Sequence, residues 1–179
     1  MREPILQMKT ITVIQGDFAV SKDENTKMAT LLGSCVATCL YDPLARIGGM
    51  NHFLLPGFCD SSSGTMSCGL NMMELLINGL LRQGADRRRL QAKMFGGAQL
   101  NGNLTNIGEQ NIEFTRDFLK YEGISLLGES VGGNVGRRIQ FCPTSGKARQ
   151  RFVSNADIHA AEKIVKAPTA VVSADLELF

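Results

Sequence analysis

Apolar and polar residues alternate with a period of two over much of the chain, which is the pattern of β-strands. In CVATCLY (35–41), Val36, Thr38 and Leu40 alternate with Cys35, Ala37, Cys39 and Tyr41. The segment RIGGMNHFLLP (46–56) reads as the next strand. We therefore predict two antiparallel strands joined by a hairpin around YDPLAR (41–46). Further strands are predicted in ITVIQGDFAV (11–20, with a turn or bulge at Gly16-Asp17), MATLL (28–32), RLQAKMFGGAQL (89–100) and ISLLGESVGG (124–133). The segment RRIQFCPTSGKARQRFV (137–153) predicts a second hairpin, which turns at Thr144–Lys147.

Two stretches change to the spacing of an α-helix. Over 70–82 the apolar residues recur at helical intervals, and Gly84 follows where a C-terminal cap belongs. A second helix is predicted over 107–121. Its inward stripe is formed by Asn111, Phe114, Phe118 and Tyr121. The Ser/Gly-rich segment 57–69 predicts a loop, and a short helix is expected near 156–165. Many strands with only two main helices indicate an α+β fold.

The composition limits the classes of function. With 179 residues, of which 44% are hydrophobic, the chain is long enough for one domain with a core. A formal net charge of +2 is not the footprint of a nucleic-acid-binding protein. No stretch approaches the roughly 20 apolar residues of a membrane span, and residues 1–10 lack a signal-peptide pattern, so we expect a cytoplasmic location. The cluster Asp86–Arg89 has two interpretations, a solvated loop or a docking patch for an acidic partner.

The cysteines and histidines do not form a recognisable disulfide or metal pattern. There are 5 cysteines and 2 histidines, and no CxxC pair is present. An odd number of cysteines argues against a disulfide framework, and so few histidines argue against a closed zinc site. We therefore expect no structural metal.

Cys35 and His52 are the strongest candidates for chemistry. They are 52 − 35 = 17 residues apart across the predicted hairpin, so antiparallel pairing can bring them side by side. An imidazole within hydrogen-bond reach can convert a thiol to the nucleophilic thiolate. A third polar group usually orients the imidazole, and Thr30 and Asn51 are the candidates. Backbone amides of the Gly33-Ser34 turn could face an oxyanion.

Other interpretations of these residue types are open. Buried cysteines usually act as small apolar core residues. This interpretation is favoured for the remaining cysteines, Cys39, Cys59, Cys68 and Cys142. A lone histidine on an apolar strand is more often structural, and His159 is a rival base on the helix expected near the C-terminal end. The segment GGNVGRR (132–138) is glycine-rich but does not match a nucleotide-binding fingerprint.

Several motifs together resemble the CheD family, the chemoreceptor glutamine deamidases of bacterial and archaeal chemotaxis. The motifs are LGSCVATCLYDP (32–43), GGMNHFLLP (48–56), AKMFGGAQL (92–100), NIGEQN (106–111), GGNVGRR (132–138) and TSGKARQR (144–151). The resemblance implies a layered α+β fold related to deamidating bacterial toxins. It covers the chain from about Thr10 to Val153, which implies a deamidase domain over 1–153 and a C-terminal tail, 154–179, that packs on the domain or extends from it.

The resemblance also implies an activity. Cys35 would be the nucleophile, His52 the base and Thr30 the third member, unless the family's spacing is rigid, in which case Ala29 takes that position. The reaction would hydrolyse glutamine side chains on the cytoplasmic region of a methyl-accepting chemoreceptor, through a thioester and with release of ammonia. It needs no cofactor or metal. A CheC-type phosphatase of CheY is a further implied partner, whereas nucleic acid and membrane insertion are not implied.

Two other functions are alternatives. The first is a non-enzymatic chemotaxis regulator that binds a CheC-type phosphatase or a receptor, although a binding module has no chemical need for both Cys35 and His52. The second is a thiol redox sensor that uses Cys35 and Cys39. On a strand these residues would lie about 13 Å apart, too far for a disulfide. On a helix they would be one turn apart and closer.

Overall fold

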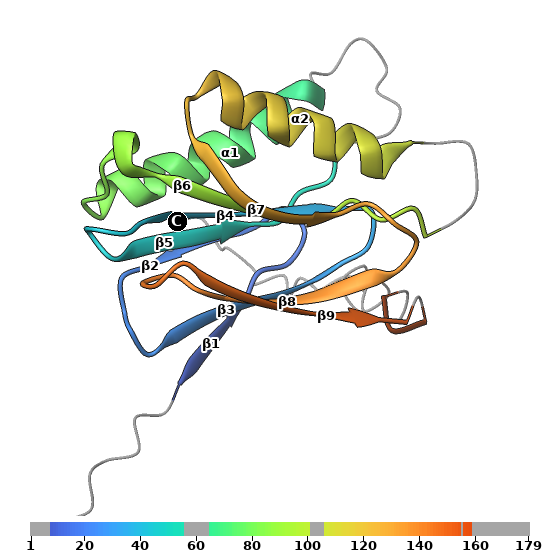
Figure 1. Ribbon diagram of the computed structural model, residues 1–179, viewed down its shortest axis with the longest axis horizontal. Coiled ribbons are helices and arrows are strands. Elements are labelled where there is room, and N and C mark those ends of the chain that lie inside the picture. Colours follow the sequence, from blue (N-terminus) through green and yellow to red (C-terminus); the bar gives the residue numbers. More distant parts are fainter. Residues whose placement is uncertain (1–7, 56–64, 101–105, 155, 159–179) are drawn as a thin grey trace, which may run out of the picture.

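The chain folds into three layers: two helices, a five-stranded sheet and a four-stranded sheet (Figure 1). The computed structural model describes residues 8–55, 65–100, 106–154 and 156–158, with backbone alone for 65–68. Both helices lie on one face of the five-stranded sheet, and the four-stranded sheet covers the other face. The α+β class and the single layered domain predicted from the sequence are confirmed.

The two sheets differ in strand order. The four-stranded sheet, here called the outer sheet, has the order β1-β3-β8-β9. Its strands are β1 (Lys9–Thr12), β3 (Thr26–Leu32), β8 (Gly136–Cys142) and β9 (Lys147–Val153). The five-stranded sheet, here called the central sheet, has the order β2-β5-β4-β6-β7. Its strands are β2 (Phe18–Ser21), β5 (Ile47–Asn51), β4 (Val36–Asp42), β6 (Gln91–Gly96) and β7 (Ser125–Val131).

The helices are α1 (Thr65–Arg82) and α2 (Ile107–Tyr121), and a short 3₁₀ turn, η1 (Arg87–Arg89), precedes β6. The predicted bounds of α2 are confirmed, but one residue of the predicted stripe, Tyr121, does not face the interior. Tyr121 is 88% exposed in the last turn, since the buried face of the helix is formed by Gly108, Asn111, Ile112, Thr115, Phe118 and Leu119. The loop predicted over 57–69 is wrong for 65–69, which are the first residues of α1. No helix in the described ranges is both long and apolar enough to cross a membrane.

Two hydrophobic cores lie on either side of the central sheet. One is formed with the helices and contains residues such as Val36, Leu40 and Leu76, and the other lies between the sheets and contains Cys35 and Cys39. Strand β4 contributes alternate side chains to each core, so it is buried on both faces.

The predicted hairpins are confirmed. Strands β4 and β5 pair antiparallel with Asp42 opposite Ile47, and β8 and β9 pair across the turn at 143–146. The predicted strand over 11–20 is divided at Gly16-Asp17, and its two halves enter different sheets as β1 and β2. The N-terminal segment therefore bridges the sheets.

The basic cluster after α1 forms ion pairs rather than a bare patch. Arg89 donates to the carboxylate of Asp42 at 2.7 Å, and Arg87 pairs with Glu122. Burial alone would raise the pKa of Asp42, but the Arg89 hydrogen bond and backbone N–H groups outweigh it and hold that pKa well below its usual range. Asp42 thus fixes the β4–β5 turn to η1.

The beginning of the predicted tail packs on the domain. Residues 156–158 are helical, and Ile158 is buried against Gly33 and Gly136, where a Cβ on either glycine would meet its side chain. His159 and the rest of the predicted helix lie outside the described residues, as does Cys59.

Candidate functional site

Cys35 lies at the end of the loop that carries the chain from the outer sheet to the central sheet. The loop joins β3 to β4, and backbone hydrogen bonds hold it: Gly97 N–H donates to the Cys35 carbonyl at 2.8 Å, and Ala98 N–H donates to the Gly33 carbonyl at 2.9 Å. Gly96 has φ +108°, and a Cβ there would overlap the Cys35 carbonyl oxygen. The first glycine of the pair in the sequence motif AKMFGGAQL, Gly96, is therefore required for the close approach of this turn to Cys35.

His52 follows β5 and faces the same side as Cys35. Val36 and Phe53 exchange two backbone hydrogen bonds of 3.0 Å, so they are directly opposite each other. In this register Cys35 and His52 are diagonal neighbours on one face, with Cα atoms about 7–8 Å apart. Each residue is 6% exposed. The structure thus brings together the two residues that the sequence singled out.

Thr30 comes from β3 of the outer sheet and contacts His52. Its Oγ1 lies 2.7 Å from the Val13 carbonyl oxygen and 2.8 Å from His52 Nδ1. A carbonyl can only accept, so the Thr30 hydroxyl hydrogen points to Val13. The His52 Nδ1–H must then donate to Thr30 Oγ1, which leaves Nε2 unprotonated. Nε2 is buried and has no hydrogen-bond partner among the described residues.

Burial sets the charge of this imidazole. It lowers the pKa of His52 to about 4, although the Val13 carbonyl and the Asp17 carboxylate favour the charged form. The backbone of His52 is also fixed, since its N–H donates to Asp17 and its carbonyl accepts from Gly16. His52 is therefore neutral near pH 7 and can accept a proton on Nε2.

The sequence left Asn51 and Ala29 as alternatives to Thr30, and neither contacts His52. The Asn51 Oδ1 accepts from Thr38 N–H at 3.0 Å, and its Nδ2 donates to the carbonyl of Met72 in α1, so this side chain faces the helices. Ala29 pairs with Gln140 and has the opposite orientation to Thr30 on strand β3. Thr30 is the residue that touches the imidazole.

Gln15 is a contact that the sequence reasoning missed. The Cys35 thiol donates to its Oε1 at 3.5 Å, and Gln15 itself is exposed on the turn between β1 and β2. No spacing rule points to it, because it approaches Cys35 only when the two halves of 11–20 join different sheets.

Asn111 of α2 is a second residue that was not recognised as part of the site. It is fully buried, its Nδ2 donates to the Ser34 carbonyl at 2.8 Å, and its Oδ1 accepts from Leu55 N–H at 2.7 Å. One carboxamide therefore ties the residue before Cys35 to the segment that follows His52. A polar residue on the inward stripe of the predicted helix was the available signal.

The other described cysteines differ from Cys35. Cys39 is fully buried on the same face of β4, and burial raises the pKa of its thiol far above the usual range, with a small opposing effect from Lys93. Cys142 is partly exposed on the outer sheet. The side chain of Cys68 lies outside the described set. Within that set, no group of three His, Cys, Asp or Glu residues is arranged to hold a metal ion.

Comparisons with known proteins give a consistent family. Residues 54–152 match the family model described as CheD chemotactic sensory transduction. The chain is 49% identical over 176 residues to a protein of Sinorhizobium medicae named probable chemoreceptor glutamine deamidase CheD, covering 96% of both chains. A protein of the same name from Acidiphilium cryptum is 51% identical over 150 residues, covering 82% of this chain and 79% of that protein. Among solved structures, the Bacillus licheniformis hypothetical protein YfiH aligns with a TM-score of 0.42 at 16% identity, over 64% of this chain and 50% of that chain.

Proposed function

The chain belongs to the CheD family, and on this premise we propose that it hydrolyses glutamine side chains of a chemoreceptor to glutamate, in the cytoplasm, with Cys35 as the nucleophile. The observation that carries the proposal is the Thr30–His52 hydrogen bond of 2.8 Å. Because the Thr30 hydroxyl donates to Val13, this bond favours the tautomer with the proton on Nδ1, and the basic Nε2 then lies on the side of the ring away from Thr30. A buried neutral histidine beside a cysteine has the arrangement of a thiol-activating base.

The first half of the reaction forms a thioester. His52 Nε2 takes the Cys35 proton, and Sγ attacks the carboxamide carbon of the substrate glutamine. The electrons of the carbonyl double bond move to oxygen, which gives a tetrahedral intermediate. When the double bond forms again, the C–N bond breaks and the amino group leaves as ammonia with the proton from His52. Thr30 holds the imidazole in the required tautomer and stabilises its charged form through its oxygen.

Gln15 has the chemistry to stabilise the oxyanion. The oxygen of the tetrahedral intermediate is two bonds from Sγ, and the Gln15 carboxamide is 3.5 Å from that sulfur. Once the thiol has lost its proton it can only accept hydrogen bonds, so the carboxamide presents its NH₂ group instead of Oε1. The same NH₂ group can then donate to the developing negative oxygen.

The second half of the reaction restores the enzyme. A water molecule loses its proton to neutral His52 and attacks the thioester carbon. Sγ leaves as the thiolate and is reprotonated by His52, and the substrate carboxyl group is released. The only co-reactant in this scheme is water.

The test is the intact mass of a chemoreceptor cytoplasmic fragment after incubation with the protein. Wild type should produce the mass gain of an amide converted to an acid, and Cys35→Ala should not. Cys39→Ala is the matched control, because it removes a thiol of the same strand that burial keeps protonated. Equal activity of Cys35→Ala and wild type would exclude the proposed nucleophile.

A CheC-type phosphatase is the second partner class that we propose, and its support is family membership. A pull-down with such a phosphatase, combined with the mass assay in its presence, would test whether binding lowers deamidation. Binding without any receptor modification by the protein alone would favour the alternative of a non-enzymatic regulator.

A further inference from the structure

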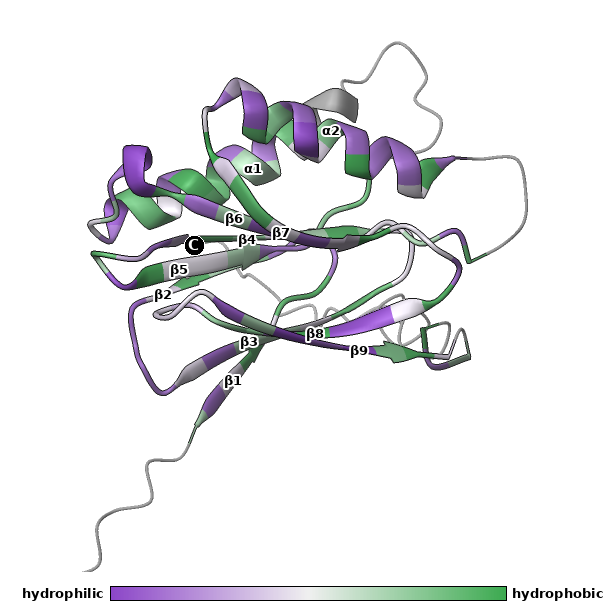
Figure 2. Cartoon of the chain, viewed as in Figure 1, coloured by the Kyte–Doolittle hydropathy of each residue, from purple (hydrophilic) through white to green (hydrophobic). Residues whose placement is uncertain are grey.

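The outer sheet has a one-sided charge. Its four strands contain seven basic residues and no aspartate or glutamate, although the whole chain has 17 acidic residues. The basic residues are Lys9, Lys27, Arg137, Arg138, Lys147, Arg149 and Arg151. Figure 2 shows the hydrophilic character of β8 and β9 on the side of the molecule away from the helices. The small net charge of the chain conceals this separation.

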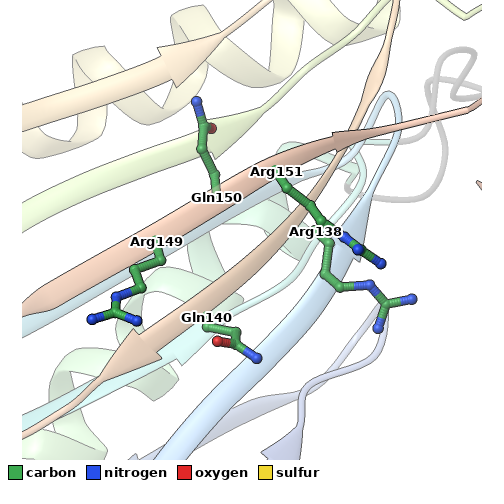
Figure 3. A pocket seen from close by; sticks show the side chains of 5 residues that line it. All are labelled: Arg138, Gln140, Arg149, Gln150 and Arg151. Carbon is green, nitrogen blue, oxygen red and sulfur yellow. The ribbon is translucent and has the colours of Figure 1, made fainter.

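Five of these residues lie on the outward side of the sheet. Ile139 and Phe141 are fully buried and point inward, so the alternate residues of β8 and their partners on β3 and β9 point outward. We call the outward set the basic face. It comprises Lys27, Arg138, Lys147, Arg149 and Arg151. Arg138, Gln140, Arg149, Gln150 and Arg151 line a hollow of about 310 Å³ (Figure 3).

The basic face is not neutralised by the part of the chain that the structure describes. Arg87, Arg89 and Arg116 all form ion pairs elsewhere in the molecule. None of the five residues of the basic face forms one with a described residue. In addition, Arg138 and Arg151 are direct cross-strand partners, an arrangement of like charges that weakens strand pairing.

One end of the basic face lies close to the Cys35 loop along the chain. Arg138 pairs with Leu31, the residue after Thr30, and Arg137 pairs with Leu32, the last residue of β3. Cys35 follows Leu32 by three residues. The basic face therefore reaches the end of the sheet at which the Cys35 loop begins.

We propose that the basic face is a docking surface for an acidic segment of the protein substrate, a proposal that rests on the proposed function. Cys35 and His52 are almost fully buried, so the site itself offers a protein substrate little contact area. Arginine side chains match carboxylates with paired hydrogen bonds. Phe152 of β9 is an exposed aromatic residue, but by register it belongs to the opposite face from Arg149 and Arg151, and its ring lies against Arg137. The basic face itself therefore has no aromatic side chain for stacking on bases, which favours an acidic protein over single-stranded nucleic acid.

The charges of the basic face also have a purely structural explanation, which makes a different prediction from the docking proposal. Strand β9 is an edge strand, and charged residues on an edge prevent pairing with other molecules. Glutamate would serve that purpose as well as arginine. Reversal of the charges therefore separates the two explanations, because it preserves edge protection and removes attraction for carboxylates.

The experiment compares Arg149→Glu/Arg151→Glu with Lys22→Glu/Lys120→Glu in the full chain. Both pairs exchange two exposed basic residues for acidic ones, and the control pair lies outside the basic face. Binding to a chemoreceptor cytoplasmic fragment is measured at ionic strengths of about 0.01 M and about 0.15 M. We expect the Arg149/Arg151 reversal to weaken binding about tenfold or more at low salt and the control to weaken it far less. Wild-type binding should also weaken as salt increases.

The readouts separate failure of docking from failure of the proposed function. If wild type deamidates the receptor fragment and the Arg149/Arg151 reversal binds it equally well, the docking proposal is wrong and the function stands. If wild type deamidates neither the fragment nor a short uncharged glutamine peptide, the proposed function fails. Peptide hydrolysis by the reversal should equal that of wild type, which also reports an intact site. Tighter binding to anionic vesicles or to an oligonucleotide than to the fragment would overturn the choice of partner.

Discussion

The side chains of Thr30 and His52 belong to different sheets and meet at 2.8 Å between Oγ1 and Nδ1. Because Thr30 also donates to the Val13 carbonyl, it can receive only the Nδ1–H of His52. A residue of the outer sheet therefore selects the tautomer of a histidine on the central sheet. The consequences of this relationship can be measured.

Replacement of Thr30 by Val should lower the kcat of deamidation by about 10- to 100-fold, since the imidazole loses the partner that orients it. Thr30→Ser should recover most of the activity, because it keeps the hydroxyl. The rate of Cys35 alkylation by iodoacetamide, measured against pH, tests the same relationship, and its profile should shift in Thr30→Val only. An unchanged profile with an unchanged kcat would show that Thr30 is merely a core residue.

Replacement of Gln15 by Ala should lower kcat by about 100-fold or more, as expected for the loss of an oxyanion donor. KM should change little, because the ground-state carbonyl makes a weaker hydrogen bond than the oxyanion does. Ile14→Ala is the control, since Ile14 is the exposed neighbour on the same turn. Similar losses in the two variants would mean that the turn, and not the Gln15 carboxamide, is responsible.

Replacement of Asn111 by Leu should lower both activity and stability. The change leaves the Ser34 carbonyl and the Leu55 N–H without their partner in a buried region, a loss of about 1–3 kcal/mol for each unsatisfied group. Thr115→Val is the matched control on α2: it removes only a hydrogen bond to the Asn111 carbonyl and should keep full activity. Urea denaturation and kcat should be measured on both. Retained activity in Asn111→Leu would contradict a positioning role.

Stability should fall between about pH 6.5 and pH 4 because of His52. The folded pKa of about 4 is below the unfolded value of about 6.5, so the unfolded state binds more protons in this window. The free energy of unfolding should therefore decrease by up to about 3 kcal/mol as pH falls across it. For Asp42 the folded pKa is lowered, so its contribution is present above about pH 4 and is lost only below that value.

The two windows allow the effects to be separated by urea denaturation at pH 7, 5 and 3. His52→Gln should remove the decrease between pH 7 and pH 5 and keep the decrease at lower pH. If this variant does not fold, titration of the wild-type His52 ring by NMR gives the same information. A midpoint near 6.5 would overturn the assignment of His52 as a buried neutral base.

Local sequence patterns predicted the elements well where one physical rule dominates. Helix α2 combines a regular stripe with Gly123 at its end, and the β4–β5 hairpin combines alternation with the Asp42-Pro43 turn. The Cys35–His52 pair followed from this hairpin register. Tyr121 was misassigned because it lies at the margin of the buried face, seven residues after the half-buried Phe114, and in the last turn of the helix.

The parts that were not predicted depend on contacts between distant segments. The separation of 11–20 into strands of two sheets is a tertiary event, and it alone brings Gln15 to Cys35. Asn111 was placed on the inward stripe of α2, but its partners Ser34 and Leu55 lie far away in sequence. The concentration of basic residues on the outer sheet was also not predicted, because the net charge of the chain is a sum over all faces of the folded molecule.

The loop before Cys35 is the covalent crossing from one sheet to the other, and this gives the site a mechanical property. Thr30 stands on one side of the crossing and His52 on the other, joined across the sheet interface by a single hydrogen bond. An increase of less than about 1 Å in the distance between Oγ1 and Nδ1 is enough to break this bond. A ligand or partner that slid the two sheets by this amount would lower the activity of Cys35 without touching it, so the rate of catalysis depends on the alignment of the two sheets.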